Sequence, residues 1–102
     1  MRLILFAACL ATLAACTSAT PTAPAFTAVT DADALKRGET AYGVRCMGCH
    51  EPATPGAPNR AALSAMTPAH IYSALTVGKM KLMAIDLPEQ DAREIASYLG
   101  KK

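Results

Sequence analysis

The sequence predicts an all-α domain whose first and last helices pack against each other. Two segments, 31–45 and 87–99, carry apolar residues at the spacing of one helix face. A third helix is predicted from Thr67 to Gly78, because Thr67-Pro68 suits an N-cap followed by the first helical residue. The chain lacks a pattern of alternating strands and helices. We therefore expect helices joined by loops, with the two long apolar faces packed together.

Length and composition limit the chain to one small core. A chain of 102 residues, part of which is expected to be removed, usually needs a disulfide, a metal or a cofactor to complete its core. Trp is absent and aromatics are 5%, so a buried cofactor would supply missing apolar surface. A net charge of +2 gives no strongly basic face, and we expect no nucleic-acid partner.

The first fifteen residues have the layout of a secretory signal peptide. Arg2 precedes an apolar run over 3–10, which is shorter than the roughly 20 residues that span a bilayer. Leu13-Ala14-Ala15-Cys16 then resembles the lipobox of bacterial lipoproteins, in which the cysteine is lipidated. We expect a signal peptide over 1–15 and a bacterial periplasmic protein that Cys16 anchors to a membrane. The alternative is ordinary cleavage after a nearby alanine, which would give a soluble periplasmic protein.

Residues 16–30 are predicted to be a flexible tether, with the folded domain at 31–102. The stretch is rich in Thr, Ala and Pro and carries no charge or apolar period, which also fits a plain disordered terminus. Asp31 and Asp33 suit a helix N-terminus, so we expect order to begin near Asp31. Gly38 lies inside this helix at a cost in stability, which suggests that another element approaches it closely.

The segment Cys46-Met47-Gly48-Cys49-His50 is the C-x-x-C-H signal for covalent attachment of c-type haem. On a helical turn, positions i, i+3 and i+4 share one face, so two thiols reach two vinyl groups while the imidazole meets the iron. Cys9 should leave with the signal peptide and Cys16 is assigned to lipid, which leaves Cys46 and Cys49 for one haem. A redox dithiol or a zinc site is the alternative interpretation of C-x-x-C.

A proline-rich loop follows the motif over 51–59. Iron-bound histidines usually donate their other ring N–H to a backbone carbonyl, and Pro58 is the candidate here, with Pro52 and Pro55 also in range. A short helical turn is expected over 61–66. His70, in the first turn of the next helix, is interpreted as a surface residue.

The second iron ligand is expected in the segment 79–84. A thioether opposite a histidine completes the coordination of haem iron, and the candidates are Met66, Met80 and Met83. The pattern alone does not separate Met80 from Met83. The last helix is predicted to start at 87–90, with Asp86 as its cap.

From about residue 31 onward the chain resembles the class I c-type cytochrome domain. The resemblance rests on the order of parts: helix, C-x-x-C-H, proline loop, middle helix, glycine, methionine loop and last helix. It implies a cytochrome c fold around one haem, with thioether links at Cys46 and Cys49, His50 as the proximal ligand and a loop methionine as the distal one. It also implies that a glycine and an aromatic residue on the first helix cross a pair on the last, and the matching residues are Gly38, Tyr42, Ile95 and Tyr98.

The methionine loop departs from the family pattern, because no proline follows Met80 or Met83. It is more similar to small cytochrome domains associated with quinoprotein dehydrogenases, whose methionine stands two residues after the glycine. That similarity favours Met80, with Met83 as the runner-up.

We therefore expect a monohaem electron carrier, not an enzyme, and a monomer. It would pass single electrons between a dehydrogenase or respiratory complex and its redox partner, the dehydrogenase being a quinoprotein by the resemblance. The alternative is a haem-based ligand sensor or peroxidase whose methionine is displaced. Lys79 and Lys81, with Arg45 and Arg60, form either a basic rim that attracts an acidic partner or a set of scattered solvated charges.

Overall fold

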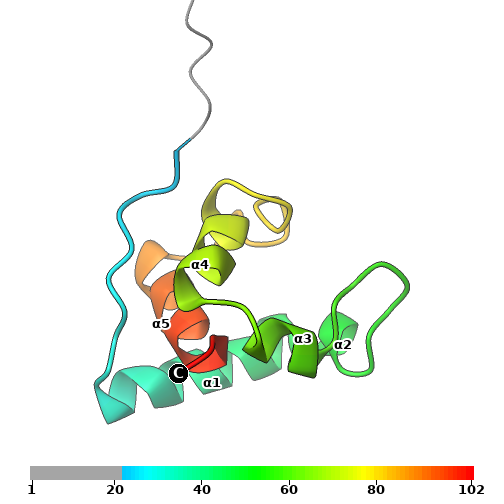
Figure 1. The fold of residues 1–102 in the computed structure, drawn as a ribbon, viewed down its shortest axis with the longest axis horizontal. Coiled ribbons are helices and arrows are strands. Elements are labelled where there is room, and N and C mark those ends of the chain that lie inside the picture. Colours follow the sequence, from blue (N-terminus) through cyan, green and yellow to red (C-terminus); the bar gives the residue numbers. More distant parts are fainter. Residues whose placement is uncertain (1–21) are drawn as a thin grey trace, which may run out of the picture.

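The computed structural model describes residues 22–102. The predicted signal peptide, Cys9 and the predicted lipidation site Cys16 lie outside this range. The described helices are α1 (Ala32–Arg45), α2 (Met47–His50), α3 (Arg60–Ser64), α4 (Pro68–Thr76) and α5 (Glu89–Leu99). Every regular element in this range is a helix, which confirms the predicted all-α fold (Figure 1). None of these helices is long and apolar enough to cross a membrane.

The helices α1 and α5 cross at Gly38, as the sequence predicted. A Cβ on Gly38 would lie only 2.3 Å from the carbonyl oxygen of Glu94, so the side chain is absent where the two backbones meet. On either side of the crossing, Tyr42 and Ile95 are each 1% exposed. Arg37 on α1 also donates to the buried carboxylate of Glu94, with 2.7 Å between Nη2 and Oε1. The crossing therefore joins the two ends of the domain by packing and by an ion pair.

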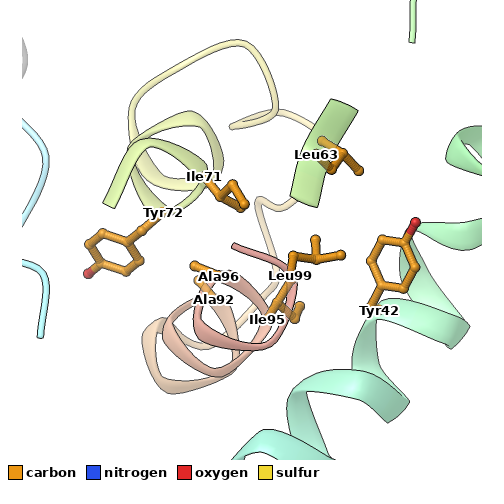
Figure 2. Close-up of a cluster of buried hydrophobic side chains, with 8 residues drawn as sticks. All are labelled: Tyr42, Leu63, Ile71, Tyr72, Ala92, Ile95, Ala96 and Leu99. Carbon is orange, nitrogen blue, oxygen red and sulfur yellow. The ribbon is translucent and has the colours of Figure 1, made fainter. Parts of the chain in front are cut away.

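The core lies between α5 and the elements that cover it. Figure 2 shows α4 on one side of α5 and the end of α1 on the other, with α3 contributing one residue. The buried cluster consists of Tyr42, Leu63, Ile71, Tyr72, Ala92, Ile95, Ala96 and Leu99. Four of these eight residues belong to α5, namely Ala92, Ile95, Ala96 and Leu99, so α5 is the element against which the others pack.

Three helices start where a side chain caps them. Asp31 accepts from the backbone N–H of Ala34 at 2.9 Å, and Thr67 accepts from that of His70 at 3.2 Å, both as predicted. The predicted turn over 61–66 is α3 at Arg60–Ser64, and its cap is Asn59. His70 is exposed, as expected. Local capping chemistry thus set these helix starts.

The cap predicted for α5 was wrong. Pro88 occupies the N-cap position, and no side chain caps this helix. Asp86 lies two residues earlier, and its carboxylate forms an ion pair with Arg45 at the end of α1. The Asp86 carboxylate therefore pairs with Arg45, which is distant in sequence, and does not cap α5 as the local pattern predicted.

Part of the predicted tether is held against the domain. Residues 22–30 have no regular structure, but the N–H of Val29 donates to Ser97 Oγ at 3.0 Å and Arg93 Nη1 donates to the carbonyl of Ala25 at 3.3 Å. The ring of Phe26 lies 5.2 Å from that of Tyr72. We expected the ordered part of the chain to begin near residue 31, but contacts with the domain begin earlier. The ring of Phe26 packs against Tyr72 on α4.

Candidate haem site

The three donor side chains of the C-x-x-C-H motif lie on one turn that continues α1. Cys46 follows the last residue of α1, and its N–H donates to the carbonyl of Tyr42 at 2.9 Å. The N–H groups of Cys49 and His50 both donate to the carbonyl of Cys46 at 3.2 Å. The turn is thus closed by its own backbone and anchored to a residue buried in the core.

The two thiols of the motif are free but differ in their surroundings. Cys46 is half-buried and Cys49 is exposed. Burial raises the pKa of the Cys46 thiol, although the charge of Arg45 acts in the opposite direction. Cys46 therefore stays a neutral thiol at neutral pH, and Cys49 is the one that solvent reaches.

The imidazole of His50 is buried, with 6% of its surface exposed, and is fixed by one hydrogen bond. Its Nδ1 lies 2.7 Å from the carbonyl oxygen of Pro58, the contact that the sequence predicted. A carbonyl only accepts, so Nδ1 carries the proton and Nε2 keeps its lone pair. This is the tautomer that binds a metal through Nε2.

The loop that supplies the Pro58 carbonyl has its own hydrogen bonds. The N–H of Thr54 donates to the carbonyl of Cys49 at 2.9 Å, and the N–H of Ala57 donates to the carbonyl of Thr54 at 3.0 Å. Gly56 has φ of 87°, a conformation that other residues rarely adopt. The prolines and this glycine turn the loop back toward His50.

The methionine segment, residues 78–87, consists of successive turns after α4. The N–H of Met80 donates to the carbonyl of Ala74 at 3.0 Å, and that of Met83 donates to the carbonyl of Met80 at 3.1 Å. A Cβ on Gly78 would lie 2.8 Å from Ala74 Cα, so glycine is needed for the close return of the chain. These bonds hold the start of the segment near α4.

Met80 and Met83 both line a small hollow that Cys46 also lines. Its volume is about 20 Å³, enough for about one water molecule. A porphyrin linked to Cys46 would therefore displace the methionine side chains that now line it. Met80 is half-buried and Met83 is 66% exposed. Met66, the third candidate, packs against the hydrophobic core instead.

The residues present fit a haem c. Two thiols and an imidazole share one turn, and two thioethers line a hollow together with Cys46 of that turn. These are the donor types that a haem c with histidine and methionine ligands requires. Large exposed apolar side chains also gather in the two segments that supply these donors: Val44, Met47, Leu82, Met83 and Ile85. Exposed apolar side chains close in sequence to the donor residues suit an apolar macrocycle bound there.

The four basic residues named as a rim do not behave alike. Arg45 is paired with Asp86, and Arg60 donates to the hydroxyl of Tyr98 at 2.9 Å. Lys79 and Lys81 are exposed. Sequence reasoning did not find the contacts of Arg60 with two rings, because Tyr42 and Tyr98 come from helices far apart in the sequence.

The fold and this site define a class I c-type cytochrome domain. The chain belongs to the family described as cytochrome C oxidase, cbb3-type, subunit III, whose model matches residues 33–99. A cytochrome c domain of this family implies haem c and electron transfer.

One curated relative is the polyvinylalcohol dehydrogenase of a Sphingopyxis species, which is 36% identical over 80 residues. The match covers 78% of this chain but only 12% of that enzyme, so the similarity concerns one part of a much longer protein. No solved structure matches the chain.

Proposed function

We propose that this protein carries single electrons in the bacterial periplasm through one covalently bound haem c. The observation that carries the proposal is the His50 imidazole, buried in the C-x-x-C-H turn with Nδ1 held by the Pro58 carbonyl. Cys46 and Cys49 form the thioether links, His50 is the proximal ligand and Met80 is the distal one. Met83 is the runner-up for the distal position.

Each of these residues has a defined task in the carrier. Haem c, when bound, supplies an iron centre that accepts and releases one electron. The two cysteines keep the group attached, and the Pro58 carbonyl keeps the His50 ring in one tautomer and orientation. With His50 and a methionine as its ligands, the iron would have no position left for a substrate, so we expect a carrier and not an enzyme.

A dehydrogenase or respiratory complex is the proposed electron donor. The similarity to part of a dehydrogenase supports an electron donor of this class. The resemblance of the methionine loop to cytochrome domains of quinoprotein dehydrogenases favours a quinoprotein as that donor. The exposed Lys79 and Lys81 would attract an acidic surface on the partner. Electron-transfer rates should then fall as salt is added, and a flat salt profile would leave these lysines without that role.

Lipid on Cys16 is proposed to tether the domain to a membrane, after cleavage of residues 1–15. Mass spectrometry of the mature N-terminus tests this part, and an acyl mass on Cys16 is expected. An unmodified start would contradict the anchor and favour a soluble periplasmic carrier.

Carbon monoxide separates the carrier from a ligand sensor or peroxidase. The reduced protein at neutral pH should not bind carbon monoxide, because methionine occupies the sixth position. Addition of the gas to the dithionite-reduced protein, followed by visible spectroscopy, measures this. Immediate and complete binding would contradict the carrier and support the sensor or peroxidase.

A further inference from the structure

Arg60 lies where α1, α5 and the start of the 51–59 loop meet. Its guanidinium carbon is 5.0 Å from the ring centroid of Tyr42 on α1 and 4.9 Å from that of Tyr98 on α5. Its Nη2 donates to the Tyr98 hydroxyl at 2.9 Å, and its Nη1 is 3.8 Å from the carboxylate of Glu51. The cation thus rests on the two aromatic side chains at the crossing of the terminal helices.

The position of Arg60 in the chain connects these contacts to His50. Arg60 is two residues after Pro58, whose carbonyl accepts from His50 Nδ1, and Glu51 directly follows His50. A single side chain therefore ties both ends of the 51–59 loop to the core. Most of that loop, residues 52–56, is exposed, and its own hydrogen bonds run to Cys49 and within the loop, not to the core.

Arg60 is not needed to keep its own helix in place. Leu63 is buried in the core cluster, and Asn59 caps α3 by accepting from the N–H of Ala62 at 2.9 Å. The interactions of Arg60 are therefore additional to the packing and capping of α3. They restrain the loop and the imidazole that the loop holds.

We propose that Arg60 is a positioning residue that holds the hydrogen bond from His50 to Pro58 and thereby sets the reduction potential of the haem. The inference rests on the proposed function, because it requires haem iron bound to His50. The hydrogen bond from His50 Nδ1–H, on the ring nitrogen that would not bind iron, makes the imidazole a stronger electron donor. A stronger donor stabilises oxidised iron. Loosening that bond raises the potential.

Arg93 provides a matched control for this proposal. Its guanidinium carbon lies 5.2 Å from the ring centroid of Tyr72, and it also bonds a carboxylate, that of Glu89. It thus makes the same kinds of contact on α5, but it binds the N-terminal segment at Ala25 and not the His50 loop. If replacement of an arginine acts only by lowering stability, both variants should show the same effects. If Arg60 positions His50, only its replacement should change the His50 hydrogen bond.

The test compares R60K with R93K in the holoprotein. Lysine keeps the charge and removes the planar fork, so a change in potential reports geometry and not lost charge. In R60K we expect the His50 Nδ1 proton to exchange with solvent about ten times faster, and we expect the reduction potential of the haem to rise. NMR of the reduced protein measures the exchange rate. In R93K neither quantity should change.

A second variant, Y98F, removes only the hydroxyl that accepts from Arg60 and leaves the ring. It should shift the exchange rate and the potential in the same direction as R60K, but less. If R60K and Y98F bind haem and both match R93K in exchange and potential, the proposal is overturned while the proposed function stands. If the unaltered protein holds no haem, the proposed function fails, and this inference fails with it.

Discussion

The two segments that supply the candidate iron ligands differ in how the protein holds them. The His50 turn continues a long helix, its imidazole is buried, and a carbonyl fixes one ring nitrogen. The methionine segment has only turns, and three of its apolar side chains, Leu82, Met83 and Ile85, are largely exposed. The protein by itself therefore fixes the His50 side of the candidate haem site.

This difference shows why one side of the site follows from the chain alone and the other does not. A histidine in a closed turn has one position, whereas two methionines three residues apart line the same hollow. On the proposed function, a bound haem would select one of the two sulfurs. We expect the proximal side to depend on helix packing and the distal side to depend on the cofactor.

Gly38→Ala should break the support of the proximal side. The new Cβ would lie 2.3 Å from the carbonyl oxygen of Glu94, so α1 and α5 must move apart. We expect the free energy of unfolding to fall by about 1–3 kcal/mol or more, measured by urea unfolding of the holoprotein. Gly43→Ala is the matched control, because a Cβ there makes only ordinary contact with Met47 and should stabilise by about 0.5–1 kcal/mol. Equal stability of the two variants would refute the close crossing.

Met80→Ala should break the distal side without loss of haem. We expect the iron–sulfur absorption band of the oxidised protein to disappear in Met80→Ala and to remain in Met83→Ala, because the half-buried Met80 is held near Cys46 by its bond to Ala74. Visible spectroscopy of both variants measures this. Met66→Ala, at a residue packed against the core, is the control and should keep the band. Loss of the band with Met83→Ala alone would reverse the assignment.

Glu94→Gln should change how the crossing responds to acid. Hydrogen bonds from Arg37 hold the pKa of the buried Glu94 carboxyl below its ordinary value of 4.5. The stability that this pair contributes is therefore present above pH 4.5 and is lost as the pH falls through the lowered pKa. Urea unfolding should show that E94Q is less stable than the unaltered protein at pH 7. On acidification, its free energy of unfolding should fall by less than that of the unaltered protein. An identical acid loss in both proteins would argue against the pair.

Tyr42→Phe should have the smallest effect and the opposite sign. The Tyr42 hydroxyl is buried, and no group of residues 22–102 meets the geometry of a hydrogen bond with it. Burial raises its pKa, although the nearby Arg60 acts in the opposite direction. Its removal should stabilise the protein by up to about 1 kcal/mol in thermal unfolding. Tyr98→Phe is the comparison, because it loses the bond from Arg60 and should destabilise by about 1 kcal/mol. A larger loss in Tyr42→Phe than in Tyr98→Phe would show that the hydroxyl has a partner.

The parts that sequence predicted correctly are those written in short patterns. Caps at Asp31 and Thr67 act on the next helical turn, and the mid-helix Gly38 marks a crossing because a glycine there is otherwise costly. The contact between His50 and Pro58 spans only eight residues. Each depends on neighbours in the chain or on one strong steric requirement.

The features that sequence missed depend on partners distant in the chain. Asp86 was assigned to a helix cap, but Arg45, 41 residues away, takes its carboxylate. Arg60 was assigned either to a basic rim or to scattered solvated charges, but its guanidinium lies against two rings, one from α1 and one from α5. Phe26 was included in a tether, but it lies against Tyr72. Nothing in the local pattern of these residues names such partners.

The central claim is that the turn Cys46–His50 holds one haem c by covalent links. The direct measurement is a pyridine haemochrome spectrum of the protein made in a bacterial host with haem-attachment machinery, recorded after denaturation and acid-acetone extraction. The account predicts one haem retained per chain, with the spectrum of two thioether links, and none retained when Cys46 and Cys49 are both replaced by serine. Complete extraction of the haem from the unaltered protein, or its absence from the start, would contradict the account.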